Sequence, residues 1–321
     1  MRAFEYSSPA SVEEAIRLLE AASRPLAGGT DLLPLMKADL ASPSRLVNVK
    51  KVLDDRIRED SGTLSLGALA VLDEIEKNPV VRQRYTALAE AAAAAASPQL
   101  RNMATIGGNL LQRPRCWYFR NPRIPCWLKG GEKCPAKEGE NRLHALCGGG
   151  PCYAVHPSDL ASALVALEAD VRVRGKTGER LIPIEDFFVL PTEAWRCETV
   201  LQPDELIVSV EIPSTEARST YLKAMERKVW TFALAGVAAV VRRSGGRVEH
   251  VRIVLTGVAP IPWRANAAED AMVGKQFSET LVTDAVDALL EDAAPLAHNA
   301  YKVPLLKTLV RRALEDIFRD R

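Results

Sequence analysis

Two segments with paired glycines constrain the fold of this chain more than any other feature. The first is AGGTD at residues 27–31, which follows an expected short strand and precedes an expected helix. The second is TIGGN at residues 105–109, which follows an alanine-rich helix expected over residues 86–96. Glycine lets backbone N–H groups approach a phosphate closely, and a following helix adds its positive end. The pair could hold one diphosphate, although either segment alone is more often a plain tight turn.

Better-known phosphate-binding motifs do not fit the chain. No G-x-G-x-x-G follows an expected strand, so the sequence does not support a Rossmann fold. Gly175-Lys176-Thr177 is similar to the end of a Walker A loop, but Asp170 stands where that loop needs glycine. We therefore discard both motifs.

The cysteines are concentrated in one segment, because five of the six lie between Cys116 and Cys152. The N-terminal residues lead into an expected helix rather than a signal-peptide core, and the reducing cytosol disfavours structural disulfides. A cysteine cluster in such a protein more often indicates metal binding or redox chemistry.

The cysteine spacing leaves three interpretations open. The segment has no C-x-x-C knuckle, which structural zinc sites commonly use. Four thiolates from a long loop can instead surround an iron–sulfur cube, with neighbouring backbone N–H groups donating to the sulfurs. His144 and His156 lie in or beside the loop, so the spacing is also compatible with a mixed-ligand zinc site, or with no metal.

Composition and charge exclude several classes of protein. The chain has 321 residues, 47% of them hydrophobic and 26% charged, so we expect a folded protein of two or three domains. The chain has forty-two Lys and Arg residues and forty-one Asp and Glu residues. The net charge of +1 leaves no basic surplus for binding nucleic acid. No apolar run approaches the roughly 20 residues of a membrane helix, so we expect a soluble, cytoplasmic protein.

The rest of the chain alternates strand and helix signals. In the first two thirds we expect a polar loop at residues 54–62, helices at 11–19 and 158–167, and strands at 46–49, 64–69, 171–173 and 206–212. After a linker at 213–219, a hairpin around Ser244-Gly245-Gly246 and three helices predict a separate α+β domain. None of the four histidines has a catalytic signature around it, so the sequence assigns no catalytic residue.

Taken together, the motifs resemble the FAD-binding medium subunit of molybdenum hydroxylases, the family of xanthine dehydrogenase and carbon monoxide dehydrogenase. The resemblance rests, in order and spacing, on residues 27–31, residues 104–109, Ser158-Asp159 and Glu205-Leu206-Ile207. It covers nearly the whole chain and extends to Asn299-Ala300-Tyr301-Lys302.

The resemblance implies an α+β protein with an FAD-binding fold of the vanillyl-alcohol-oxidase/p-cresol-methylhydroxylase type. Two α/β subdomains, at residues 1–55 and 56–213, would sandwich FAD, and a C-terminal α+β domain would follow at 219–321. The second subdomain would carry an inserted iron–sulfur loop at residues 113–153.

The resemblance also implies which residues hold FAD. The diphosphate and the adjacent ribityl chain would be held by the two glycine segments, namely Leu26, Ala27, Gly28, Gly29, Thr30, Asp31, Leu32, Thr105, Ile106, Gly107, Gly108 and Asn109. Asp159 would bond the flavin side, with Ile207 and Lys223 near the isoalloxazine ring.

The cysteine loop narrows the resemblance to 4-hydroxybenzoyl-CoA reductase β subunits and to the flavin subunits of some bacterial aldehyde oxidoreductases. In those proteins an inserted loop carries an extra [4Fe-4S] cluster. Their pattern maps the four ligands onto Cys116, Cys126, Cys134 and Cys152, with Cys147 as the spare cysteine and the remaining alternative.

The function implied by the resemblance is electron transfer, with substrate turnover on a partner. That partner would be a molybdenum-cofactor large subunit, joined by a small subunit with two [2Fe-2S] clusters in a dimer of heterotrimers. FAD would exchange electrons between these cofactors and an external carrier. Two alternatives stay open: a stand-alone flavin oxidase or dehydrogenase of the same fold, and a zinc-stabilised interaction protein.

Overall fold

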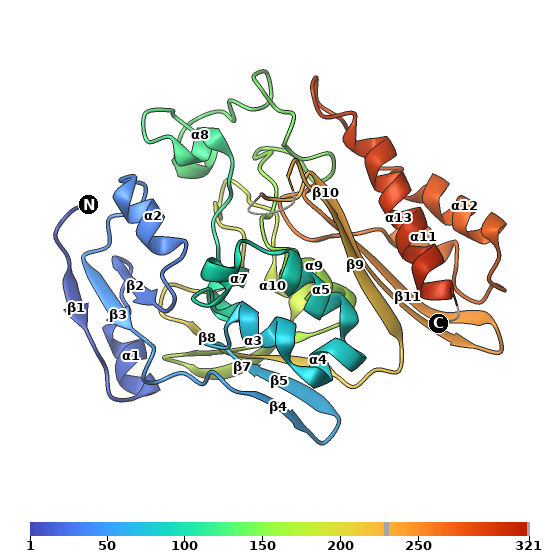
Figure 1. The fold of residues 1–321 in the computed structure, drawn as a ribbon. Helices are drawn as coiled ribbons and strands as arrows, with labels where there is room; N and C mark the ends of the chain where they lie inside the picture. The colour runs from blue at the N-terminus through green and yellow to red at the C-terminus, as the bar shows by residue number, and fades with distance from the viewer. Residues whose placement is uncertain (228–230, 320–321) are drawn as a thin grey trace.

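The strands of the chain form three sheets that follow one another from the N-terminus to the C-terminus (Figure 1). The structure is a computed structural model that describes residues 1–227 and 231–319. In this part of the chain, no helix is long and apolar enough to cross a membrane.

The N-terminal sheet has three parallel strands in the order β1-β3-β2. Its elements are β1 (Glu5–Ser7), α1 (Val12–Leu18), β2 (Ser23–Leu26), α2 (Leu32–Lys37) and β3 (Arg45–Asn48). Helix α1 begins as expected at Ser11, whose side-chain oxygen accepts a hydrogen bond from the backbone N–H of Glu14 at 3.1 Å. Ala15 and Ile16 of this helix are buried against Val47 of the sheet.

The middle sheet has five antiparallel strands in the order β4-β5-β8-β6-β7. The strands are β4 (Ile57–Asp60), β5 (Thr63–Gly67), β6 (Asp170–Gly175), β7 (Gly178–Pro183) and β8 (Leu206–Pro213). The prediction of a polar loop at residues 54–62 is wrong, because β4 occupies part of this range. Strand β4 is an edge strand held by backbone pairing with β5, and most of its side chains are exposed, so it carries no apolar alternation.

Seven helices of the middle region accompany this sheet. They are α3 (Leu72–Lys77), α4 (Pro79–Arg84), α5 (Thr86–Ala94), α6 (Pro98–Arg101), α7 (Ile106–Leu110), α9 (Asp159–Ala166) and α10 (Ile184–Phe187). Every residue of α9 is buried, including the polar residues Asp159 and Ser162. The small side chains of α5 let it pack closely, and Figure 1 shows α5 and α9 between the middle sheet and strand β9.

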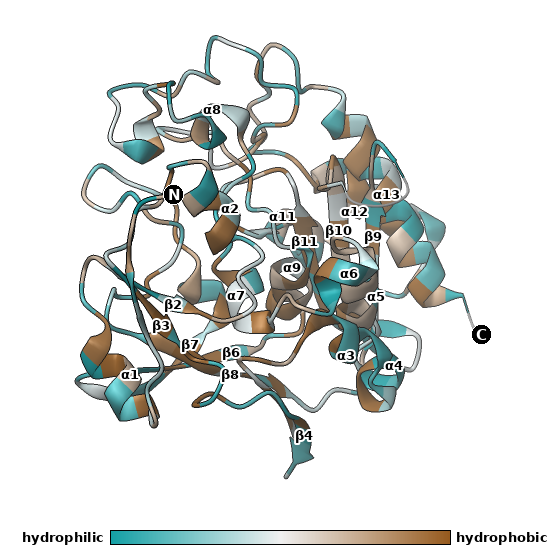
Figure 2. Ribbon diagram, turned by 60° about the vertical axis from the view of Figure 1, so that its left-hand side comes forward, coloured by the Kyte–Doolittle hydropathy of each residue, from teal (hydrophilic) through white to brown (hydrophobic). Residues whose placement is uncertain are grey.

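The C-terminal region is an antiparallel sheet with helices on one face. Its strands, in the order β12-β11-β10-β9, are β9 (Arg218–Ala224), β10 (Ala235–Ser244), β11 (Arg247–Thr256) and β12 (Trp263–Arg264). Its helices are α11 (Asn266–Asp270), α12 (Glu279–Ala288) and α13 (Lys302–Phe318). The β10–β11 hairpin is confirmed: Ser244 pairs with Arg247, and both intervening glycines have positive φ. In Figure 2, the outlying α13 alternates hydrophilic and hydrophobic residues, and its buried residues face the sheet.

The cysteine-rich loop runs from α7 to α9 with little regular structure. Between those helices the described chain forms only α8 (Trp117–Arg120) and the short 3-10 helix η1 (Trp127–Lys129). The loop is nevertheless anchored at both sides. Phe119 and Trp127 pack with Leu35 of α2, and the backbone N–H of Leu146 donates to the Val258 carbonyl at 2.7 Å. The loop therefore joins the N-terminal and C-terminal regions of the molecule.

Candidate cofactor-binding site

The first glycine segment connects β2 to α2 and touches the residues before the second segment. Gly29 has φ +71°, a backbone conformation that favours glycine. A Cβ atom at Gly28 would lie 1.8 Å from the carbonyl oxygen of Met103, so only glycine permits this approach. The first segment thus packs against Met103 and Ala104, the residues that directly precede the second segment.

The second glycine segment is not a tight turn, which corrects the simplest sequence interpretation. It forms the start of α7, where the Thr105 hydroxyl accepts from the backbone N–H of Gly108 at 3.2 Å. A Cβ atom at Gly107 would lie 3.1 Å from the Ala68 carbonyl, so this glycine lets the helix lie close to the end of β5. At the other end of the segment, Asn109 Oδ1 accepts a hydrogen bond of 2.5 Å from the Ser158 hydroxyl.

Asp31 ties the first glycine segment to the start of the cysteine loop. Its carboxylate accepts from the backbone N–H of Arg113 at 2.8 Å and from Arg120 at 2.9 Å, and it also pairs with Arg115. Burial opposes the charge of Asp31, but Arg115 and Arg120 outweigh it and hold the pKa of Asp31 below its usual value. Arg115 also donates to the Gln112 side-chain oxygen at 3.1 Å, and the Gln112 amide donates to the Asn109 carbonyl at 2.9 Å, which links the loop to the second segment as well.

Asp159 forms a buried ion pair with Lys223. The Lys223 ammonium lies 2.7 Å from Asp159 Oδ2 and also donates to the Ala94 carbonyl at 3.0 Å. The Tyr221 hydroxyl donates to Asp159 Oδ1 at 2.6 Å. Burial raises the pKa of Asp159, and Lys223 and Tyr221 oppose that shift. Lys223 lies on strand β9, so the pair links α9 to the C-terminal sheet.

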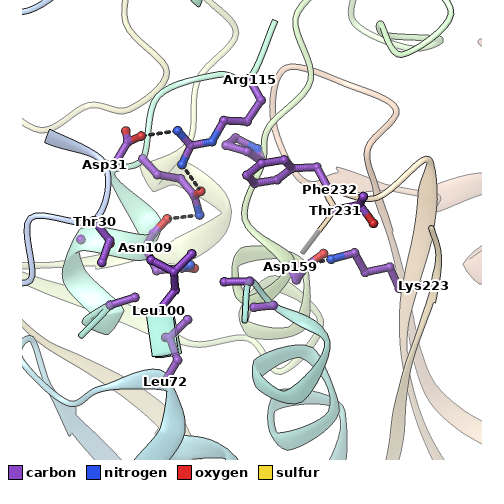
Figure 3. Close-up of a pocket in the computed structure, with 16 residues that line it drawn as sticks. Thr30, Asp31, Leu72, Leu100, Asn109, Arg115, Asp159, Lys223, Thr231 and Phe232 are labelled. Carbon is purple, nitrogen blue, oxygen red and sulfur yellow. Dashed lines mark hydrogen bonds and ion pairs between the residues drawn. The ribbon is translucent and has the colours of Figure 1, made fainter. Parts of the chain in front are cut away.

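These groups meet at one pocket (Figure 3). Six of its lining residues were predicted to bind a cofactor or lie within one of the glycine segments, namely Thr30, Asp31, Gly108, Asn109, Asp159 and Lys223. The other residues of the two segments do not line this pocket. Ile207 is placed elsewhere: it is buried in the core of the middle sheet, where it pairs with Val173 of β6.

Sequence reasoning missed the remaining residues of the pocket wall. They are Leu72, Ala95, Ala96, Leu100, Ala104, Gln112, Arg115, Pro157, Thr231 and Phe232. Most come from helix ends and loops that carry no motif, so only their packing reveals them. A second hollow adjoins the pocket, shares Arg115, Pro157, Thr231 and Phe232 with it, and reaches Cys116 and His144.

Four of the five loop cysteines gather in one cluster with apolar neighbours. Cys126 and Cys152 are buried beside Leu35 and Trp127, with Cys116 and Cys134 at the edge of the same cluster. Burial raises the pKa of Cys116 to about 11, and the nearby thiols of Cys126 and Cys134 add to the rise. A hydrogen bond from Cys152 lowers the pKa of Cys134 to about 6. The charge on one of these sulfurs therefore shifts the pKa of its neighbours.

Backbone amides surround the same four sulfurs. Their N–H groups come from Tyr118 and Phe119 at Cys116, Leu128 and Lys129 at Cys126, Ala136, Lys137 and Tyr153 at Cys134, and Ala154 at Cys152. Such donors stabilise negative charge on sulfur. Within residues 1–227 and 231–319, however, no three His, Cys, Asp or Glu side chains converge closely enough to hold a single metal ion.

Cys147 stands apart from these four cysteines. It is buried in the C-terminal core, and its backbone N–H donates to the Val258 carbonyl at 3.0 Å. Burial raises the pKa of its thiol to about 11, with a smaller contribution from Asp292. The neighbours of Cys147 are thus the C-terminal core rather than the other loop cysteines.

Known proteins with the same architecture match along the whole chain. The family of FAD-binding domains in molybdopterin dehydrogenases matches residues 2–215, and the family of CO dehydrogenase flavoprotein C-terminal domains matches residues 220–317. The aldehyde oxidoreductase FAD-binding subunit PaoB of Escherichia coli (strain K12) is 37% identical, over 98% of both chains. The carbon monoxide dehydrogenase medium chain of Hydrogenophaga pseudoflava is 32% identical, over 97% of this chain and 96% of its own.

Solved structures agree with these relatives. Carbon monoxide dehydrogenase from Hydrogenophaga pseudoflava, in a form lacking the Mo-pyranopterin moiety, superposes with a TM-score of 0.77 at 33% identity, covering 98% of this chain and 96% of its own. Quinoline 2-oxidoreductase from Pseudomonas putida 86 gives 0.74 at 26% identity, covering 98% of this chain and 97% of its own. The fold is that of a flavoprotein subunit of an oxidoreductase, and the expected fold class is confirmed. The chain belongs to the family of FAD-binding medium subunits of molybdenum hydroxylases.

Proposed function

We propose that this chain is the FAD- and [4Fe-4S]-binding electron-transfer subunit of a molybdenum-containing hydroxylase or reductase. The enzyme would be similar to aldehyde or xanthine dehydrogenases, or to 4-hydroxybenzoyl-CoA reductase. The observation that carries the proposal is one arrangement: the two glycine segments line a pocket together with Asp159 and Lys223, and Cys116 of the four-cysteine cluster lines the adjoining hollow.

The glycine segments fit the diphosphate of FAD. Residues 26–32 and 105–109 would hold the diphosphate and ribityl chain, because both segments line one pocket and Gly28 lets the first segment approach the residues that precede the second. Asp159 would bond the flavin side and Lys223 would lie near the ring system, since both line the pocket, whereas Ile207 does not line it. Bound FAD would supply one- and two-electron chemistry, while the chain binds and orients it.

The four-cysteine cluster fits a four-iron cluster better than a single zinc ion. A zinc ion needs its donors to converge on one point, whereas each thiolate of a four-iron cube binds a different iron. Cys116, Cys126, Cys134 and Cys152 belong to one apolar cluster, and each accepts hydrogen bonds from nearby backbone amides, which supports their proposed role as ligands.

The nearness of the two proposed sites supports electron transfer between the flavin and the iron–sulfur cluster. Arg115 lines the proposed flavin pocket, and the next residue along the chain is the proposed iron ligand Cys116. The relatives are named as medium chains or FAD-binding subunits, so we propose partners of the same kind here. They would be a molybdenum-cofactor large subunit and a small subunit with two [2Fe-2S] clusters, in a dimer of heterotrimers.

The test is to purify the chain with its associated subunits and to measure absorption, flavin, iron and zinc. We expect flavin bands with a broad iron–sulfur shoulder, about four irons per flavin from this chain, and two further subunits. Flavin without the additional iron would overturn the cluster. A colourless zinc protein would favour the interaction-protein alternative. A single subunit that reduces its flavin with a small substrate would favour the stand-alone oxidase.

A further inference from the structure

His144 contacts the sulfur of one proposed iron ligand directly. Its Nε2 atom lies 3.2 Å from Cys116 Sγ, within hydrogen-bonding distance for sulfur. His144 is 2% exposed, so water does not compete effectively for this contact. The proposed roles of the cysteines do not account for this histidine, because it is not itself one of the four ligands.

The direction of the hydrogen bond follows from the chemistry of the acceptor. A thiolate bound to iron has no hydrogen of its own, so Nε2 must carry the proton that it donates. The other ring nitrogen, Nδ1, is buried and has no hydrogen-bond partner among the described residues. The arrangement is that of a neutral imidazole with its N–H aimed at sulfur.

The ring is held in place from both sides. Trp117 meets it edge to face, with ring centroids 5.2 Å apart, and the Tyr118 ring centroid lies 5.9 Å away. Both aromatic residues directly follow Cys116, so the ring and the sulfur it contacts belong to one packed unit. The backbone N–H of His144 donates to the Asn141 carbonyl at 2.9 Å.

The C-terminal region fixes the backbone of His144. Its carbonyl accepts from the fully buried Lys302 ammonium at 3.0 Å and from the Asn299 side-chain amide at 3.2 Å. Lys302 also donates to the Gly257 carbonyl at 2.8 Å. The start of α13 therefore sets the position of a histidine that contacts the cysteine cluster.

We propose that His144 is a positioning residue which donates an Nε2–H hydrogen bond to Cys116 and thereby raises the reduction potential of the cluster. This inference rests on the proposed function, because it needs the cluster to be present. An N–H donor disperses negative charge on the ligand sulfur, which favours the reduced, more negative state of the cluster. Lys302 and Asn299 keep the donor in reach.

The test compares two variants of the full chain, purified with its associated subunits. His144→Leu fills similar volume without a donor, whereas His144→Gln retains an amide N–H. His298→Gln is the matched control, because that histidine is exposed. Iron per flavin and the cluster's midpoint potential, from a redox titration followed by electron paramagnetic resonance, are the measurements.

We expect His144→Leu to keep its iron but to show a lower midpoint potential, with His144→Gln close to wild type and the control unchanged. A His144→Leu variant with its iron and the wild-type potential would overturn this inference alone. If His144→Leu loses its iron, the Gln variant decides: wild-type iron and potential support the hydrogen bond, and loss of iron there too overturns it. Wild-type protein without the additional iron would overturn the proposed function itself, and this inference with it.

Discussion

The carboxylate of Asp159 and the ammonium of Lys223 lie 2.7 Å apart, with side chains only 5% and 2% exposed. The pair connects α9 to β9 at the wall of the predicted flavin pocket. Two charges so deeply buried are stable only together, because either one alone would lose its hydration without a partner. The pair therefore couples the shape of the pocket to the packing of the C-terminal sheet.

Removing one member of this pair should destabilise the chain strongly. We expect Lys223→Met to lower the free energy of unfolding by about 3–5 kcal/mol, because Asp159 is left buried and unpaired. The double variant Asp159→Asn/Lys223→Met should recover part of this loss. Urea unfolding followed by circular dichroism measures both. The partly exposed pair of Asp73 and Lys77, 2.8 Å apart, gives the control, and Asp73→Asn should cost about 0–1 kcal/mol. Additive losses in the double variant would contradict the coupling.

Gly28→Ala should separate the two glycine segments. The new Cβ atom would lie 1.8 Å from the Met103 carbonyl, so the backbone must move. We expect a loss of about 1–3 kcal/mol in stability and a lower ratio of flavin to protein after gel filtration. Gly175→Ala is the matched control, because its nearest contact is the flexible Glu205 side chain. Equal flavin retention in both variants would show that close approach at Gly28 is not needed.

Acid should destabilise the folded chain through His156. Burial lowers the pKa of His156 from 6.5 to about 3. Below pH 6.5 the unfolded chain therefore binds a proton that the folded chain excludes until about pH 3, and the free energy of unfolding falls as the pH falls through this window. The contribution is about 2 kcal/mol between pH 7.5 and pH 5.

His156→Gln should remove that part of the pH dependence. Urea unfolding at the two pH values measures it, and His298→Gln serves as the exposed control. Burial also lowers the pKa of His144, to about 4. His144 therefore makes the free energy of unfolding fall with falling pH as well, and both variants keep this contribution. A His156→Gln variant with the wild-type slope would show that His156 takes up its proton as readily in the folded chain as in the unfolded chain.

Cys147 should be dispensable for iron binding. Its side chain lies in the C-terminal core, away from the four-cysteine cluster, so Cys147→Ala should keep the wild-type iron per flavin and lose only packing energy. Cys134→Ala, which removes one of the clustered thiols, should lose iron. Colorimetric iron and flavin assays on the two purified variants compare them directly. Iron loss in Cys147→Ala with retention in Cys134→Ala would reverse the assignment.

Local sequence signals predicted the elements that depend on neighbouring residues. The capping serine at position 11, the glycine pair at 245 and 246, and the alanine-rich α5 each act within a few residues of the chain. Strand β4 was missed because its side chains are mostly exposed, and its pairing with β5 comes from backbone groups that carry no pattern. The second glycine segment was taken for a turn because glycine is rare inside helices. Its place against Ala68 is a tertiary contact.

Sequence by itself determined the family, the two glycine segments and the presence of a cysteine-rich loop, since these are properties of residue type and order. Only the tertiary structure decided that Asp159 faces Lys223, 64 residues away, that His144 reaches Cys116, and that Cys147 lies apart from its neighbours in the chain. It also placed Ile207 in the core rather than at the pocket. The physical reason is that burial, close backbone approach and pairing across the chain depend on how sheets and helices pack, whereas turns and helix caps depend on a few adjacent residues.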